Sequence, residues 1–83
     1  GTCLWEALIE LWGKEPNASQ YIVLTDADSE DSDLLEDSEF MDTPEAQRTH
    51  IVLTPGWNIS WNHRCLAESY GMEFTPIDSY WGS

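Results

Sequence analysis

The tetrapeptide Ile-Val-Leu-Thr occurs twice in this chain, at residues 22–25 and again at residues 51–54. Each copy lies within a short run of aliphatic and β-branched residues that does not alternate with polar ones. Runs of this kind are typical of strands that are covered on both faces, as they are in a parallel sheet. We therefore expect two neighbouring strands that are both buried.

The segment 3–12, CLWEALIELW, is predicted to be a helix that is covered on most sides. Leu4, Leu8 and Leu11 recur at helical spacing, and tryptophan and isoleucine residues widen the same apolar face. Gly13 follows this segment and is a natural C-terminal stop for the helix.

A second helix and a third strand follow the second aliphatic run. Asn58 or Ser60 could cap a helix that reaches about residue 70, and Gly71 would end it. Residues 72–77, MEFTPI, supply the further strand. Strand, helix and strand within residues 50–77 together have the size of a compact parallel crossover unit.

Eighty-three residues are enough for one small domain. Hydrophobic residues make up 41% of the chain and ten residues are aromatic, which is more apolar bulk than a disordered acidic tail carries. We predict a single α/β domain over residues 1–83, with two helices packed on a short, mainly parallel sheet. Residues 26–47 are predicted to lie outside that framework, as an acidic and mobile insert. This insert is either a solvated loop or a short helix around residues 33–42, DLLEDSEFMD.

The charge of the chain is concentrated in that insert. Sixteen acidic residues stand against three basic ones, Lys14, Arg48 and Arg64, which gives a net charge of −13. Ten of the sixteen acids lie between Asp26 and Glu45. A protein that grips nucleic acid directly needs a basic surface, so direct nucleic-acid binding is not expected. A protein partner with a basic surface is favoured instead.

The order of the expected elements, helix, strand, strand, helix and strand, resembles the BRCT domain from its first helix onward. In that family a Thr-His pair leads into a hydrophobic strand, and a helix with small residues near its end is followed by a glycine, a buried strand and a tryptophan. Thr49, His50, Ala67, Gly71 and Trp81 occupy roughly these places here. The resemblance covers most of the chain and implies a small α/β fold of the kind described above.

The departures from the BRCT pattern concern the phosphopeptide site. The phosphopeptide-binding members use a Ser or Thr near the first strand and a Lys at the start of the second helix. The first strand of the family would lie before Gly1, and His63 or Arg64 would have to replace the lysine. For this chain, the resemblance therefore does not imply recognition of phosphopeptides.

Cys3 and Cys65 are the two cysteines of the chain. They allow either one disulfide or two buried thiols in a reducing compartment, and they are too few for a zinc site of the usual thiolate kind. Cys3 also stands at the start of a helix, in a stretch, GTCLWEAL, that looks like viral papain-like cysteine proteases. With His50 as the general base, an alternative function is a fragment of such a protease.

The stretch VLTDAD places Asp26 and Asp28 directly after a hydrophobic strand. Locally it resembles nucleotide-sugar transferases, in which a D-x-D pair holds a divalent metal, and phosphatases whose first aspartate is the nucleophile. Both kinds of enzyme need a larger domain and basic residues for the phosphate. What remains is weak, incidental binding of a divalent ion by Asp26 and Asp28, and no cofactor is expected.

The same junction, YIVLTDADSEDSD, has the pattern of peptides that dock on modifiers of the SUMO kind, in which aliphatic residues precede acids and serines. Such peptides bind by strand addition, with the aliphatic side chains in a groove and the acids facing basic residues. Ser29 and Ser32, which stand among acids, would suit an acidophilic kinase. This interpretation needs a strand that is available to a partner, and a strand in the centre of the sheet is not available.

The acidic insert also carries bulky apolar residues, in the stretch DLLEDSEFMD. Acidic segments with spaced apolar side chains commonly fold against a groove or a basic surface of a partner. Two tryptophans near the turn PGWNISW are expected as further anchors, and packing over the sheet edge is the alternative for them. The predicted partner-binding residues are Asp28, Glu30, Asp31, Asp33, Leu34, Leu35, Phe40, Trp57 and Trp61.

We therefore predict a non-catalytic protein-interaction module whose acidic insert docks on a basic partner surface. A second alternative is an acidic mimic of nucleic acid that inhibits a DNA- or RNA-binding protein, because carboxylates can stand in for phosphates. No stretch approaches the ~20 apolar residues that span a bilayer, so no membrane association is expected. An intracellular location, in cytoplasm or nucleus, is favoured, and the sequence leaves the oligomeric state open.

Overall fold

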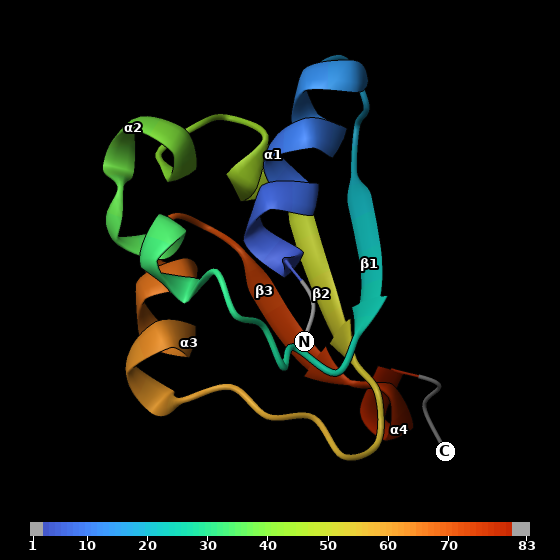
Figure 1. Cartoon of the computed structure of the whole chain (residues 1–83). Coiled ribbons are helices and arrows are strands. Elements are labelled where there is room, and N and C mark those ends of the chain that lie inside the picture. The colour runs from blue at the N-terminus through green and yellow to red at the C-terminus, as the bar shows by residue number, and fades with distance from the viewer. Residues whose placement is uncertain (1–2, 81–83) are drawn as a thin grey trace.

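The computed structural model describes residues 3–80, and Figure 1 shows how their elements are arranged. Within these residues the helices are α1 (Leu4–Lys14), α2 (Ser38–Met41), α3 (Trp61–Ser69) and α4 (Ile77–Tyr80). Two 3-10 turns, η1 (Ser32–Glu36) and η2 (Ala46–Arg48), lie between the first two strands. The strands are β1 (Tyr21–Thr25), β2 (Thr49–Leu53) and β3 (Glu73–Pro76). Trp81, which the BRCT resemblance includes, lies outside the described residues.

The three strands form one parallel sheet in the order β1-β2-β3 (Figure 1). Val23 of β1 is paired with Ile51 of β2, which is paired in turn with Phe74 of β3. The prediction of a small α/β domain with a parallel sheet is confirmed. The two predicted helices correspond to α1 and α3. The short helix α2 lies within residues 33–42, where a short helix was the alternative to a loop, and α4 is an addition to the prediction.

One face of the sheet carries the hydrophobic core. Residues of α1, of α3 and of the segment between β1 and β2 join this face in a single cluster of buried side chains. A hydrogen-bond chain ties α1 to the sheet: the indole N–H of Trp12 donates to Thr49 Oγ1 at 2.9 Å in the core, and this hydroxyl donates to the carbonyl of Glu45 at 2.9 Å. The buried Thr49 side chain thus connects α1, β2 and the residue that precedes η2.

β1 is an edge strand, because β2 is its neighbour on one side only. Its Ile22 and Leu24 side chains are 48% and 59% exposed, whereas Val52 on the same face of β2 is 1% exposed. The expectation of burial on both faces therefore holds for β2 and is wrong for β1, where alternate side chains face solvent. An edge position also leaves β1 available for strand addition. Such an available strand is what docking on a modifier of the SUMO kind requires.

The acidic segment, residues 26–47, belongs to the framework of the domain and does not lie outside it. Its short helical turns bring Leu35, Met41 and Ala46 into the core, where each side chain is fully buried. Leu35 was predicted to bind a partner, and this is wrong because no part of it reaches the surface. Burial of a leucine side chain contributes about 1.5–3 kcal/mol to folding, so Leu35 anchors the segment.

Glycines near the two longer helices have different roles. Of the two predicted cap residues, Asn58 and Ser60, it is Ser60 that caps α3, since its hydroxyl accepts the backbone N–H of His63 at 3.2 Å. Gly71 follows α3 with a φ of 100°, and a Cβ atom there would lie 2.8 Å from Cγ of Gln47, so only glycine fits. In contrast, α1 continues through Gly13, and the predicted stop at this residue is wrong.

No helix among the described residues has the length and apolar character needed to cross a membrane.

Candidate functional site

The C-terminal end of β1 passes into a tight turn that starts the acidic segment. Thr25 Oγ1 accepts the backbone N–H of Ala27 at 3.0 Å, and Asp26 Oδ1 accepts that of Asp28 at 3.0 Å. Ala27 has a φ of 60°, which is uncommon for alanine, and its methyl group is buried. The two side-chain bonds hold this turn in the manner of ST and Asx turns. The Asp26 carboxylate therefore serves the local backbone.

Beyond the turn, the acidic segment reaches back to the start of α1. Ser29 Oγ accepts the backbone N–H of Leu4 at 3.2 Å, and the Asp31 carboxylate accepts those of Trp5 at 3.4 Å and Glu6 at 2.8 Å. These N–H groups have no partner within the helix, and the residue at the N-cap position makes no side-chain cap of its own. Two distant side chains therefore cap α1, a role that local capping patterns in the sequence do not reveal.

The Asp31 carboxyl group is held in its charged form. Partial burial raises its pKa, but hydrogen bonds from Ser29 and from the backbone N–H groups of Glu6 and Trp5 outweigh burial and place the pKa below its ordinary value. A negative charge at a helix N-terminus is favourable in addition. Asp31 was predicted to bind a partner, and Ser29 was noted as suited to an acidophilic kinase. Both side chains are engaged in holding α1.

Most of the acids in the segment nevertheless point to solvent. Eight of its ten acidic residues are exposed, namely Asp26, Asp28, Glu30, Asp33, Glu36, Asp37, Glu39 and Asp42. Leu34 is half-buried against the core, whereas Phe40 is 42% exposed. The segment therefore turns its apolar residues mainly inward, where they anchor it, and displays its carboxylates outward.

The two tryptophans that the sequence indicated as anchors are both exposed. Trp57 is 40% exposed, and Trp61, the first residue of α3, is 73% exposed. The backbone N–H of Asn58 donates to the carbonyl of Asp26 at 2.8 Å, which holds the loop that carries Trp57 beside the end of β1. Packing over the sheet edge does not describe Trp61, because a packed ring would not be so open to solvent. The role of both rings in binding a partner stays a prediction.

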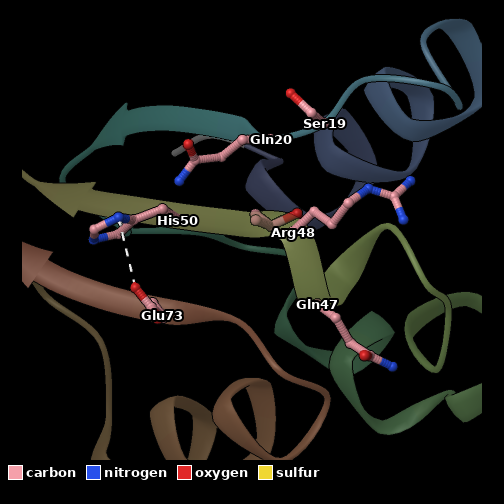
Figure 2. Close-up of a pocket in the computed structure, with 7 residues that line it drawn as sticks. Ser19, Gln20, Gln47, Arg48, His50 and Glu73 are labelled. Carbon is pink, nitrogen blue, oxygen red and sulfur yellow. Dashed lines mark ion pairs between the residues drawn. The ribbon is translucent and has the colours of Figure 1, made fainter.

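A polar pocket of about 290 Å³ lies where β1 and β2 begin, at the other end of the strands (Figure 2). It is lined by Ser19, Gln20, Gln47, Arg48, Thr49, His50 and Glu73. Arg48 Nε donates to the carbonyl of Ala18 at 3.0 Å, and its Nη2 donates to that of Pro16 at 3.1 Å. Because its guanidinium is used in this way, Arg48 joins the loop before β1 to β2 and is not set up to hold an anion in the pocket.

Cys3 and His50, the catalytic pair of the protease alternative, lie at opposite ends of the domain. His50 Nε2 is 2.7 Å from Thr75 Oγ1, and the preceding residue, Thr49, contacts Trp12 near the end of α1. Cys3 precedes the first turn of α1, and a helix rises ~1.5 Å per residue, so roughly 13 Å of helix separates it from Trp12. Strand alternation also turns His50 to the face opposite α1. The two side chains do not form a nucleophile and base pair.

Neither cysteine has the environment that the sequence suggested. Cys3 and Cys65 are both free and exposed, so a disulfide and a pair of buried thiols are both wrong. Local desolvation raises the pKa of the Cys3 thiol, and the carboxylates of Asp31, Glu6 and Glu30 raise it further. The thiol therefore stays protonated at neutral pH and lacks the activation that a catalytic cysteine needs.

Asp26 and Asp28, the predicted weak metal pair, are not part of a three-ligand cluster within the described residues. The side chains that come close together there are those of Cys3, Glu6 and Asp31, whose ligand atoms lie within 4.8 Å of one another. Both carboxylate oxygens of Asp31 already accept hydrogen bonds from the start of α1. This cluster is therefore accounted for by the cap, and it gives no reason to invoke a metal.

Besides the exposed tryptophans, the described surface carries the outward-facing acids of residues 26–47 and the open edge of β1. The open edge belongs to β1, and the acids belong to the segment that follows β1 in the chain. Neither feature includes Cys3 or the polar pocket. No protein-family model, no curated protein and no solved structure matches the chain.

Proposed function

We propose that the chain is a non-catalytic protein-interaction module whose acidic segment docks on a basic surface of a partner protein. The observation that carries this proposal is the orientation of side chains within residues 26–47, where Leu35, Met41 and Ala46 are buried and eight acids are exposed. A carboxylate array on a folded support loses less conformational entropy on binding than one on a disordered chain. The acids are therefore presented in a form suited to docking.

The chain has few cations of its own to neutralise these acids. Arg48 reaches Glu45 at 3.9 Å, but most of its donors go to main-chain carbonyls. Arg64 pairs with Glu68 at 3.6 Å and lies over the ring of Phe74. A basic partner would therefore meet a strong negative field, which favours fast and selective association.

The resemblance to the BRCT family supports the proposal in a limited way. The order α1, β1, β2, α3, β3 is the order on which the resemblance rests, with η1, α2 and η2 inserted between β1 and β2. Arg64, one of the two replacements for the phosphate-binding lysine of the family, is engaged by Glu68 and Phe74. This favours a partner that is recognised by basic charge over a phosphopeptide.

Two charge-matched variants test the proposal. The first neutralises exposed acids of the segment that are not used as caps, and the second removes the same number of charges elsewhere. The segment variant carries Asp33→Asn, Glu36→Gln, Glu39→Gln and Asp42→Asn. The control variant carries Glu6→Gln, Glu10→Gln, Glu15→Gln and Asp78→Asn.

The binding probe is a random peptide library displayed on phage and selected on the unaltered chain. We expect the selected peptides to be rich in lysine and arginine, to lose about tenfold or more in affinity for the segment variant, and to keep most of their affinity for the control. Their affinity should also fall with added salt. Selected peptides that are neutral or acidic, or an equal loss with both variants, would contradict the proposal.

The folded support of the acids also favours a second function, mimicry of nucleic acid phosphates, because a mimic needs charges in fixed positions. In that case a basic DNA-binding protein held on the chain should be released by duplex DNA, and its affinity should fall steeply with salt concentration. Release by duplex DNA, but not by an uncharged polymer of similar size, is the expected result for a mimic. Binding that duplex DNA does not displace would exclude mimicry and leave the docking module.

A further inference from the structure

β1 offers main-chain hydrogen-bonding groups at an open edge of the sheet. The carbonyl of Thr25 accepts the N–H of Thr54 at 3.0 Å, so the main-chain groups of Thr25 point toward β2. In a parallel ladder, the N–H and C=O groups of alternate residues point to opposite sides of the strand. Those of Ile22 and Leu24 therefore point away from β2, to the side where β1 has no neighbouring strand among the described residues.

Ile22 and Leu24 also carry the exposed side chains of β1. Backbone groups and apolar surface are thus available on the same two residues. A strand added beside β1 could take hydrogen bonds from this edge and lay its own side chains against both residues. In Figure 1, β1 forms the border of the sheet, with β2 between it and β3.

β1 lacks the devices with which proteins usually protect an edge strand. Its sequence, YIVLT, contains no charged residue and no proline. The charges begin immediately after it, at Asp26, and continue with the exposed Asp28 and Glu30. An edge that is uncharged along its length and acidic at one end favours a strand that is aliphatic along its length and basic at one end.

We propose that β1 is a strand-docking edge, which pairs with an extended aliphatic segment of a partner whose basic end lies beside Asp26, Asp28 and Glu30. The inference rests on the proposed function, because the partner is the same basic protein, and it specifies how that partner is held. A second copy of the chain is a poorer occupant, since each copy has a net charge of −13.

Two synthetic peptides of equal length and charge test the proposal by calorimetric titration of the full chain. The strand probe joins a Lys-Arg-Lys flank to a repeat of valine and threonine, and it is made with the flank at either end to allow for both strand directions. The charge probe joins the same flank to a repeat of glycine and serine, which forms strands poorly. The strand probe, in one of its two orders, is expected to bind about tenfold or more tightly than the charge probe.

Three single variants locate the binding. Leu24→Lys introduces a like charge at the edge and should weaken the strand probe by about tenfold or more. Ala7→Lys introduces the same charge at an exposed residue of α1, away from the edge, and should alter the affinity by less than about threefold. Leu24→Pro removes an outward N–H without touching the ladder to β2, and it should weaken binding as well. If the proline variant fails to fold, the affinity of the Leu24→Lys variant alone shows whether the strand probe binds at β1.

Equal binding of the two probes, or equal losses with Leu24→Lys and Ala7→Lys, would overturn the strand-docking edge. If the two probes bind equally but both bind more weakly to the segment variant with its four neutralised acids, the proposed function survives and the strand-docking edge does not. The edge alone is overturned if library-selected basic peptides bind and the strand probe does not. Dimers that sedimentation detects and that Leu24→Pro abolishes would assign the edge to a second copy and overturn the proposed occupant.

Discussion

The two copies of Ile-Val-Leu-Thr lie side by side in the sheet, yet their environments differ. In β2, Ile51 and the two residues after it are all buried, whereas in β1 both Ile22 and Leu24 are exposed. Register is one reason: Ile51 is paired with Val23 and not with Ile22, so the identical residues are out of phase by one position. A shift of one residue moves every side chain to the other face of a sheet.

Strand order is the second reason for the difference. β2 lies between two strands, and both of its faces are covered, since Ile51 and Val52 point to opposite faces and are each buried. Among the described residues β1 has one neighbouring strand, and the side chains of Ile22 and Leu24 leave one of its faces exposed. The same four residues therefore build the core in one strand and leave exposed side chains in the next, depending on their position in the sheet.

The equivalent leucines of the two copies provide the strongest test of this difference. Leu53→Ala should lower the free energy of unfolding by about 2–5 kcal/mol, because it leaves a cavity in the core. Leu24→Ala should lower it by less than about 1 kcal/mol, because the side chain is already largely in water. Urea unfolding followed by tryptophan fluorescence measures both. A large loss for Leu24→Ala would show that its face is covered in solution and would remove the open edge.

Two threonines give a second, smaller contrast between the strands. In β2, Thr49→Val would leave the indole N–H of Trp12 without an acceptor in the core, which should cost about 1–3 kcal/mol. In β1, Thr25→Val removes the acceptor for the N–H of Ala27 in a half-buried turn, and should cost less than about 1 kcal/mol because water can replace it. Thermal unfolding of both variants measures the difference. Similar losses of stability would mean that the hydrogen bonds of Thr49 in the core contribute no more than the hydrogen bond of Thr25 in the turn.

A single methylene group makes the comparison finer. Ile51→Val should cost about 0.5–1.5 kcal/mol because Ile51 is completely buried, while Ile22→Val should be close to neutral. Both replacements keep a β-branched residue, so strand propensity is nearly unchanged and the difference reports burial alone. Urea midpoints with unchanged slopes would measure it. Equal midpoints for the two variants would indicate that the faces of the two strands are covered alike.

Local patterns in the sequence were sufficient to predict the α/β fold class, the parallel sheet and both longer helices. The cap at Ser60 and the stop at Gly71 were also predictable, because they depend on residues next to the helix that they bound. The burial of β2 followed from its aliphatic run. In each case the determining interactions lie within the element or directly beside it.

The features that the sequence did not predict depend on contacts between distant residues. Strand order cannot be obtained from an aliphatic run, so the exposure of Ile22 and Leu24 was missed. The burial of Leu35 was missed because it lies in a stretch rich in acids, which the short turns of the segment direct outward. Asp31 caps a helix that starts more than 25 residues before it, and no local capping pattern can indicate such a pair.

The cap made by Asp31 gives the smallest expected effect. Asp31→Asn keeps an acceptor oxygen for the start of α1 but removes the negative charge from the helix N-terminus. The free energy of unfolding at pH 7 should therefore fall by only about 0.5–1 kcal/mol, since the group is partly exposed and screened by solvent. Asp33→Asn, which neutralises an exposed acid of the same segment, is the matched control and should have a smaller effect.

The dependence of this effect on pH separates charge from shape. The pKa of Asp31 in the folded domain lies below the ordinary value of 3.8, so the charged form is favoured by folding. Its contribution to stability is complete above that value and is lost as pH falls through the folded-state pKa. The difference between the natural chain and Asp31→Asn should thus be constant from about pH 5 to 8 and shrink below about pH 4. A stability difference that persists at low pH would mean that the packing of Asp31, and not its charge, stabilises α1. In that case the acidic segment would hold α1 by shape and not by its negative charge.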